Sequence, residues 1–207
     1  MKDTVFVFAR APRLGTVKRR LAHDIGDRAA LRFHQAMLTR LLRRLLPDRR
    51  FRTILAITPD RARLRWPIAL PTVPQGRGDL GQRMQRLFDG HRHGRALIVG
   101  CDIPGLGRAD IVAAFRALGR ADACFGPAED GGYWLVGMGP RRPARAFANV
   151  RWSCEHALAD TRHNFAGRRT ALLRRLRDVD TAADLRALAP NFVVGQHRRT
   201  NLAGARG

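Results

Sequence analysis

The chain has 207 residues, of which 45% are hydrophobic, as is typical of one globular domain with a sizeable core. Its apolar runs are far shorter than the roughly 20 residues that a membrane span requires. No signal-peptide pattern opens the sequence, so we expect a cytoplasmic protein without a membrane span. The three cysteines are widely spaced and odd in number, which favours reduced, mostly buried thiols over a disulfide framework.

The charge is strongly positive. Lys+Arg number 39 against 17 Asp+Glu, a formal net charge of +22, and only Lys2 and Lys18 are lysines. Such a balance predicts attraction to the phosphates of nucleic acid, nucleotides or anionic lipid. The arginines are scattered through every segment, however, whereas nucleic-acid modules usually concentrate them beside exposed aromatic residues. We therefore expect solvated basic faces, with nucleic-acid binding only as non-specific adhesion.

A basic loop follows the first predicted strand, which covers residues 5–9. The loop contains Arg10, Gly15, Lys18 and Arg20, and a helical pattern begins within it. Backbone N–H groups at a helix start, with cations beside them, can form a phosphate cradle. The Walker A pattern is absent, and a basic turn in solvent is an equally good interpretation of the loop alone.

Hydrophobic periodicity predicts the elements that follow. They are a helix over 27–46, a strand over 53–58, an edge strand near 69–73 and a helix over 80–88. Asp79 has the position of an N-cap for the last of these helices. Gln75 could reach a ligand over the same sheet edge, but a capped helix with a basic outer face explains this segment slightly better.

The segment ALIVGCDIPGL, residues 96–106, is the predicted centre of the sheet. Its first four residues are apolar without alternation, as in a strand that is buried on both faces. Asp102 stands at the carboxyl end of this strand, where ligands of open α/β sheets bind. Mg²⁺ prefers one or two carboxylates together with phosphate oxygens, so Asp102 is the leading metal ligand. Its position equally favours a cap for the helix predicted from near Gly107.

A second carboxylate pair lies in FGPAEDGGYWLVGM, residues 125–138. Glu129 and Asp130 precede two glycines, between strands predicted over 122–125 and 133–138. Carboxylates in a glycine turn suit contact with a metal or with sugar hydroxyls. An ordinary Asp-Gly hairpin turn explains the same residues equally well.

The last third of the chain has shorter predicted elements. They are a helix over 154–161 capped by Ser153, a strand over 170–173, and a helix ending near 188 that is capped by Asp180 or Thr181. Residues 195–207 have no apolar period, which predicts a flexible tail after a single domain of residues 1–194.

Six segments, in their order along the chain, resemble one known family: FARAPRLGTVKRRLA, QGRGDLGQRM, GCDIPGL, GPAEDGGYWLVGM, WS and DVDTAADL. This is the bacterial DUF2064, or glycosyltransferase-A-like, family, whose relatives include the 2-phospholactate and molybdenum-cofactor guanylyltransferases. The resemblance covers the chain from Val5 to about Leu188. It implies a three-layer α/β/α sandwich of the nucleotide-diphospho-sugar transferase superfamily, a Rossmann-like GT-A fold with a mostly parallel central sheet.

The resemblance also implies roles for individual residues. The implied nucleotide-binding residues are Arg10, Gly15, Lys18 and Arg20 near the phosphates, and Gln75 and Asp79 near the base or ribose. The implied catalytic residues are Lys18, Arg20, Asp102 and Asp130, with Mg²⁺ or Mn²⁺ on Asp102 and Asp130 either sharing the metal or facing the acceptor. The chain departs from the family at Arg19, where a threonine is common, and so lacks a hydroxyl that could touch phosphate or metal.

The expected function is a Mg²⁺-dependent transferase, with nucleotidyl transfer from an NTP to a small phosphorylated or hydroxyl acceptor favoured. The acceptor would attack the α-phosphorus and pyrophosphate would leave, while a metal on Asp102, with Lys18 and Arg20, would stabilise the negative transition state. A cationic loop suits a triphosphate, and no D-x-D pair starts at Asp102. Glycosyl transfer from a sugar nucleotide, and a non-catalytic basic nucleotide- or nucleic-acid-binding protein, are the alternatives, because fold does not fix reaction.

Overall fold

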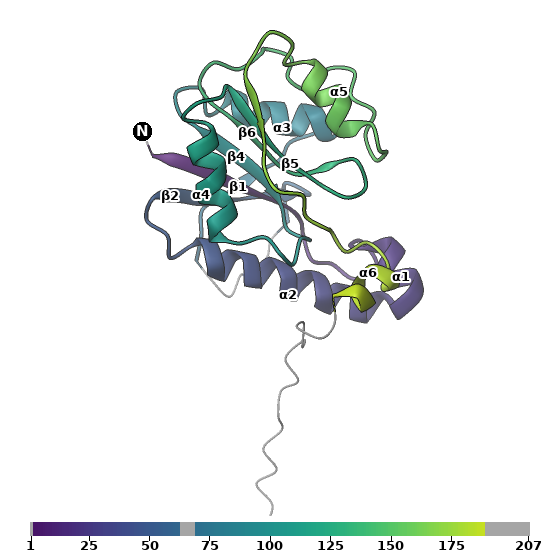
Figure 1. Ribbon diagram of the computed structural model, residues 1–207. Helices are drawn as coiled ribbons and strands as arrows, with labels where there is room; N and C mark the ends of the chain where they lie inside the picture. Colours follow the sequence, from purple (N-terminus) through teal and green to yellow (C-terminus); the bar gives the residue numbers. More distant parts are fainter. Residues whose placement is uncertain (1, 63–68, 189–207) are drawn as a thin grey trace, which may run out of the picture.

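A central sheet between helices forms the body of the protein, whose computed structural model describes residues 2–62 and 69–188 (Figure 1). The strands are β1 (Asp3–Arg10), β2 (Phe51–Thr58), β3 (Thr72–Pro74), β4 (Ala96–Gly100), β5 (Ala123–Pro127), β6 (Tyr133–Met138) and β7 (Thr170–Leu172). The helices are α1 (Arg19–Ile25), α2 (Asp27–Leu45), α3 (Leu80–Asp89), α4 (Arg108–Ala117), α5 (Ala157–His163) and α6 (Ala182–Ala187).

The sheet has the strand order β3-β2-β1-β4-β6-β5-β7. β1 pairs in parallel with both β2 and β4, β2 with β3, and β5 with β7. β6 is antiparallel to its neighbours β4 and β5. The sheet is therefore mostly parallel, as predicted. The parallel pairing brings the carboxyl ends of β1, β2 and β4 to one edge, where open α/β sheets bind ligands.

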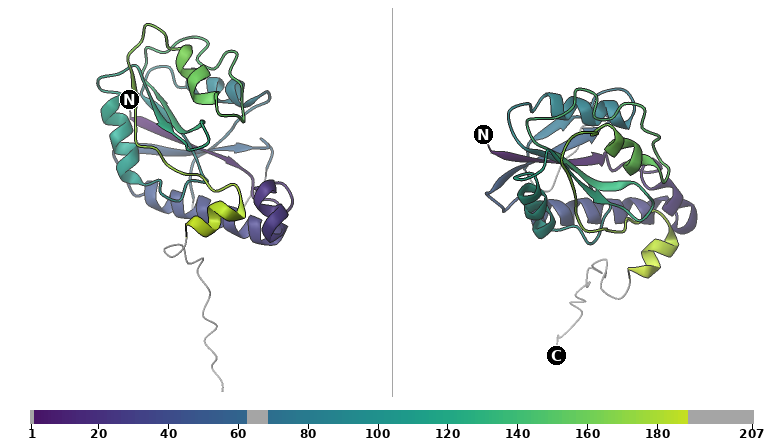
Figure 2. Two further views of the ribbon diagram at one scale, coloured as in Figure 1. Left: turned by 45° about the vertical axis from the view of Figure 1, so that its right-hand side comes forward. Right: turned by 45° about the horizontal axis from the view of Figure 1, so that its top comes forward.

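The two faces of the sheet are covered by different helices, as Figure 2 shows. Val5 and Val7 of β1 belong to the core cluster that contains α2 and α4. Phe6, on the opposite face of the same strand, packs in a second cluster with α3. Both faces of β1 are thus buried, which explains why its sequence is apolar without alternation. The predicted three-layer α/β/α sandwich is confirmed.

A smaller core joins the two ends of the described chain. Leu21 of α1 and Phe33 of α2 pack with Val179 and Ala182, and the Asp24 carboxylate accepts a hydrogen bond from the Ala182 N–H at 3.1 Å. Figure 1 accordingly shows α6 beside α1. The segment before α6 is therefore held next to the loop between β1 and α1, although well over a hundred residues separate them in sequence.

Most predicted elements are confirmed close to their expected bounds. The edge strand predicted near 69–73 is β3, at one end of the sheet order. Asp79 caps α3 in a capping box with Gln82, and Thr181 caps α6 by accepting a hydrogen bond from the Asp184 N–H. Within the described residues, no helix is long and apolar enough to cross a membrane.

The prediction for Ser153 was wrong. It does not cap a helix, because α5 begins only at Ala157, after His156. Ser153 instead has a φ of 62°, in the left-handed region that few residues other than glycine adopt. The predicted tail, 195–207, lies outside the described residues.

Candidate active site

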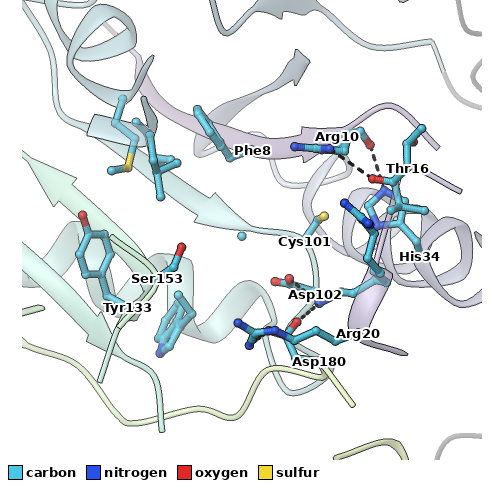
Figure 3. A pocket seen from close by; sticks show the side chains of 18 of the residues that line it. Phe8, Arg10, Thr16, Arg20, His34, Cys101, Asp102, Tyr133, Ser153 and Asp180 are labelled. Atoms are coloured by element: carbon cyan, nitrogen blue, oxygen red, sulfur yellow. Dashed lines mark hydrogen bonds and ion pairs between the residues drawn. The ribbon is translucent and has the colours of Figure 1, made fainter. Parts of the chain in front are cut away.

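A cavity of about 690 Å³ opens at the carboxyl ends of β1 and β4 (Figure 3). Part of its lining is charged: Arg10, Lys18, Arg19, Arg20, Asp102 and Asp180. Another part is apolar or aromatic and includes Phe8, Leu80, Met84, Ile98, Tyr133, Trp134 and Val136. The cavity therefore offers one half suited to an ionic group and one half suited to an uncharged group.

Lys18 is the central charged residue of the cavity. Its ammonium Nζ donates to Asp102 Oδ2 at 2.7 Å and to Asp180 Oδ1 at 2.7 Å, and its side chain is only 7% exposed. Burial by itself would lower the pKa of this ammonium, but the charges of Asp102 and Asp180 outweigh burial and raise the pKa above its usual value. Lys18 therefore carries its charge throughout the physiological pH range.

The backbone of Lys18 is constrained as well. Lys18 is the residue before α1 and has φ 48° and ψ 50°, a left-handed conformation that is uncommon outside glycine. Strained backbone of this kind often accompanies functional residues, because the surrounding structure must hold it in place. Here the two ion pairs with Asp102 and Asp180 hold the side chain on the cavity side of the loop.

Asp102 reaches the cavity because β4 ends two residues before it. A Cβ added to Gly100 would lie 2.9 Å from Ile103 Cδ1 and 3.1 Å from Asp102 Oδ1, so a glycine allows this close turn. The alternative, that Asp102 caps the following helix, is wrong. Gly107 precedes α4, and its N–H donates to Asp110.

Asp180 is a site residue that the sequence analysis treated only as a possible helix cap. Because Thr181 caps α6, the Asp180 carboxylate is free to bind Lys18, and it also lies 3.7 Å from Arg20 Nη1. The Asp180 N–H donates to the Asp184 carboxylate at 3.1 Å, which fixes the backbone. No local signal marked Asp180 in the sequence, because aspartate and threonine are both common N-caps and the two residues are adjacent.

Two further aspartates lie near this group. The pKa of the Asp178 carboxyl is raised to about 6, first by burial and then by the negative charges of Asp130, Asp180 and Asp102. Asp130 itself is exposed, and its Oδ1 accepts a hydrogen bond from the Gly132 N–H at 2.9 Å. Asp130 does not line the cavity. The structure thus joins Asp102 with Asp180 through a shared cation, and places Asp130 farther out.

The predicted phosphate-binding residues lie at different depths. Arg10 lines the cavity, where its Nη1 donates to the Thr16 carbonyl at 3.3 Å. Arg20 also lines the cavity, and its side chain is 75% exposed and available to an anion. Gly15 has a φ of 71° and forms the turn of the loop without lining the cavity.

Gln75 and Asp79 are not among the lining residues. The Gln75 side chain is buried and donates to the carbonyls of Ala9 and Ala56, which lie on neighbouring strands. The Asp79 carboxylate accepts from the Gln82 N–H as the cap of α3. Both side chains are thus engaged within the protein, and the contacts that they make explain their presence without a nucleotide.

Among the other lining residues, His34 and Ser153 are polar and were given no ligand-binding role by the sequence analysis. His34 of α2 is buried, which lowers the pKa of its imidazole, and its Nε2 lies 2.9 Å from the Arg10 carbonyl oxygen. The neutral ring can donate there and so hold the chain at the end of β1. Ser153 is exposed and lines the cavity beside Tyr133. No motif marks His34, whereas Ser153 belongs to the WS segment of the family resemblance and was assigned only as a helix cap.

Comparison with known proteins assigns the family. The DUF2064 family model, described as an uncharacterized protein conserved in bacteria, matches residues 41–154. The chain belongs to this family. The resemblance that the sequence motifs suggested is therefore confirmed. No curated protein shows significant similarity to the chain in sequence.

Solved structures show the same fold. A protein of Desulfovibrio desulfuricans G20 that is proposed to be a nucleotide-diphospho-sugar transferase is 24% identical, with a TM-score of 0.81 over 97% of this chain and 92% of its own. A CMP:2-keto-3-deoxy-manno-octonic acid synthetase complexed with CTP is 11% identical, with a TM-score of 0.55 over 90% and 96%. Molybdopterin-guanine dinucleotide biosynthesis protein A of Archaeoglobus fulgidus is 12% identical, with a TM-score of 0.51 over 90% and 96%. This chain therefore has the fold of these solved structures.

Proposed function

We propose that this DUF2064 protein is a metal-dependent transferase that transfers a nucleotidyl group from an NTP to a small phosphorylated or hydroxyl acceptor. The observation that carries the proposal is the meeting of a cationic loop with two carboxylates in one cavity at the carboxyl ends of parallel strands. Lys18 joins Asp102 and Asp180 there, with Arg10 and Arg20 in the same lining. Such strand ends are where α/β proteins of this kind place their ligands.

The cations of the loop suit a polyphosphate. Arg20 is largely exposed and, among the described residues, has a single ion-pair contact, with Asp180 at 3.7 Å, so its guanidinium can bind phosphate oxygens in a bidentate manner. Arg10 lines the same cavity from the end of β1. A relative in fold was solved with a nucleoside triphosphate, CTP, which supports this class of donor.

The carboxylates suit a divalent metal. Mg²⁺ binds proteins through one or two carboxylates and completes its octahedral shell with water and substrate phosphates. Asp102 and Asp180 already hold one cation, the Lys18 ammonium, between their oxygens. No set of three or more His, Cys, Asp or Glu side chains with metal-binding geometry occurs among residues 2–62 and 69–188, so phosphate oxygens would have to complete the shell. When bound, Mg²⁺ or Mn²⁺ would neutralise the charge that develops on the phosphates.

The roles of the residues in the reaction follow from their positions. Arg10 and Arg20 would bind and orient the phosphates, Asp102 and Asp180 would hold the metal, and Lys18 would stabilise negative charge in the transition state. No covalent nucleophile is required. Glycosyl transfer from a sugar nucleotide remains the alternative reaction for the same residues, and the leaving group distinguishes the two reactions.

A ligand screen tests the proposal. Thermal unfolding is measured with the four NTPs and several sugar nucleotides, with and without Mg²⁺, on wild type, Asp102→Ala and Asp89→Ala. Asp89 is an exposed carboxylate of α3 outside this cavity and serves as the control. A ligand at about 100 times its Kd should stabilise the folded state by about 2.7 kcal/mol. We expect a Mg²⁺-dependent shift with an NTP that Asp102→Ala loses and Asp89→Ala keeps.

Product analysis then separates the reactions. Release of pyrophosphate from the stabilising NTP, in the presence of acceptor candidates, supports nucleotidyl transfer. Stabilisation by a sugar nucleotide, with release of a nucleoside diphosphate, would replace it with glycosyl transfer. A chain that is stabilised by neither ligand class, in either variant or in wild type, would refute the proposed function.

A further inference from the structure

We propose that the Lys18 ammonium occupies the divalent-metal position in the free protein, so that metal binds firmly only when nucleotide phosphates draw Lys18 away from Asp102 and Asp180. The inference rests on the proposed function, because it assigns a control step to the same site. It makes Lys18 an internal counter-cation that couples the binding of metal to the binding of nucleotide.

The first argument is geometric. Nζ of Lys18 lies 2.7 Å from Asp102 Oδ2 and 2.7 Å from Asp180 Oδ1. Asp102 and Asp180 are also the carboxylates that would hold a divalent ion. The ammonium and the ion would then need the same space between the carboxylates. The space holds only one of the two cations. When the ion binds, the Lys18 side chain therefore has to swing away, and it stays in the site because it is part of the chain.

The second argument is electrostatic. Four aspartates gather here, since Asp178 lies close enough to Asp102, Asp180 and Asp130 to be affected by their negative charges. Lys18 is the only cation that pairs with two of them among the ion pairs within 2–62 and 69–188. Because its side chain is 7% exposed, water and salt screen its charge very little. A divalent ion that approaches these carboxylates therefore meets a group that is already neutralised in part, and meets repulsion from the ammonium.

The third argument concerns how Lys18 can leave. The Lys18 Nζ lies 2.7 Å from both carboxylates, so the group that has to move is held by two ion pairs. A charged group that leaves two carboxylates needs another anion as its partner. The phosphates of a nucleotide held by Arg10 and Arg20 at the edge of the same cavity would supply that partner.

The choice of side chain at position 18 agrees with this role. Lys2 and Lys18 are the only lysines among 39 basic residues, so the chain otherwise uses arginine for its cations. A guanidinium is planar with its donors in a rigid fork, whereas an ammonium is compact and sits on a flexible stem. The compact ammonium suits a metal-sized space between two carboxylates, and its flexible stem lets it turn to a phosphate.

The scarcity of lysine also provides the first test. Wild-type protein with ¹⁵N-labelled lysine gives two Nζ signals in NMR, one for Lys18 and one for Lys2, which serves as the internal reference. We expect the Lys18 signal to stay unchanged with Mg²⁺ alone. It should shift when Mg²⁺ is added together with the NTP that stabilises the protein, tested among ATP, GTP, CTP and UTP. A Lys18 signal that stays unchanged when metal and NTP are both bound would overturn the inference.

The second test measures metal affinity without nucleotide. Mn²⁺ is titrated into the protein and the free ion is followed by electron paramagnetic resonance. Lys18→Met should bind Mn²⁺ at least about tenfold more tightly than wild type, because a repelling charge has been removed from the site. Lys18→Arg, which keeps the charge, should bind as weakly as wild type. Arg13→Met removes one charge from an exposed residue of the same loop and should leave the affinity unchanged.

The gain in Mn²⁺ affinity expected for Lys18→Met must depend on the carboxylates of the site. The double variant Lys18→Met, Asp102→Asn should lose the gain. Equal Mn²⁺ affinity of wild type and Lys18→Met would overturn the inference, as would an equal gain in Arg13→Met, which would show a general effect of net charge. If Lys18→Met fails to fold, the NMR experiment on wild type decides the question.

The two tests also separate this inference from the proposed function. If the wild type binds Mg²⁺ with an NTP and both tests are negative, the transferase proposal stands and the role of Lys18 is refuted. If no NTP binds in any condition, the coupling has no nucleotide to act through and both proposals are refuted.

Discussion

Gln75 gives the sharpest test of how the site is supported. Its side chain is 1% exposed, and its Nε2 donates to the Ala9 carbonyl at 3.0 Å and to the Ala56 carbonyl at 2.9 Å. These carbonyls lie near the carboxyl ends of β1 and β2, directly before the loops that form the functional edge of the sheet. Gln75 therefore ties two neighbouring strands together where the site begins.

Gln75→Leu keeps the side-chain volume nearly constant and removes both donors. Each hydrogen bond contributes about 0.5–1.5 kcal/mol, so the substitution should lower the free energy of unfolding by about 2 kcal/mol. For a chain of this size, that corresponds to a fall in Tm of roughly 4–8 °C. Gln35→Leu, at an exposed position of α2, is the matched control and should stay within about 0.5 kcal/mol of wild type.

Urea unfolding followed by circular dichroism measures the effect. The midpoint should fall for Gln75→Leu with an unchanged m-value, since the folded and unfolded surfaces stay the same. NTP affinity, measured well below the Tm, should change little. The reasoning is refuted if Gln75→Leu unfolds with the wild-type midpoint while losing NTP affinity. That result would instead support the contact with the base that the family resemblance implied.

Three further predictions follow from the structure. Asp102→Asn should lower the free energy of unfolding by about 1–2 kcal/mol in urea titration. The loss is smaller than for a fully buried pair, because the Asp102 side chain is 34% exposed and Lys18 keeps its ion pair with Asp180. Gly126→Ala should cost about 1–3 kcal/mol and alter the near-UV spectrum, because the added Cβ would collide with the Trp134 ring. Burial opposes ionisation of Asp184, but hydrogen bonds from Thr181 and Arg177 outweigh it and lower the carboxyl pKa to about 2. Its stabilising contribution is then complete above about pH 4 and lost toward pH 2. The free energies of unfolding of wild type and Asp184→Asn, measured by urea titration at each pH, should therefore converge over that pH interval.

The sequence was sufficient for the parts of the fold that depend on local pattern. β4 is apolar without alternation because both of its faces are buried, and this pattern alone identified it as the centre of the sheet. The position of Asp102 after β4 then placed a carboxylate at the functional edge. These inferences hold because strand periodicity and parallel pairing are general consequences of backbone geometry.

Contacts between distant segments were beyond the reach of the same reasoning. The pairing of Lys18 with Asp180 spans 162 residues and depends on how α6 packs beside α1. No local rule distinguishes an aspartate that caps a helix from one that stands before a better cap. Ser153 shows the reverse error, because a serine before a helical pattern was taken as a cap, whereas the turn there delays the helix to Ala157.

The arginine content has a structural cause that composition did not reveal. Arg142 donates to three backbone carbonyls, those of Phe88, His91 and Gly94, and so fixes the turn between α3 and β4. Other arginines also donate to backbone carbonyls in loops or at element ends: Arg44, Arg86, Arg95 and Arg174. A guanidinium has five donors in a fixed fork and can satisfy several acceptors, which an ammonium does less well. The expectation that these arginines only cover solvated faces was therefore incomplete. Because some of the positive charge serves to hold loops together, net charge is a poor guide to the ligand. The ligand class is better argued from the cations that line the cavity, of which Lys18 and Arg20 lie beside the carboxylates of Asp102 and Asp180, the arrangement on which the proposed function rests.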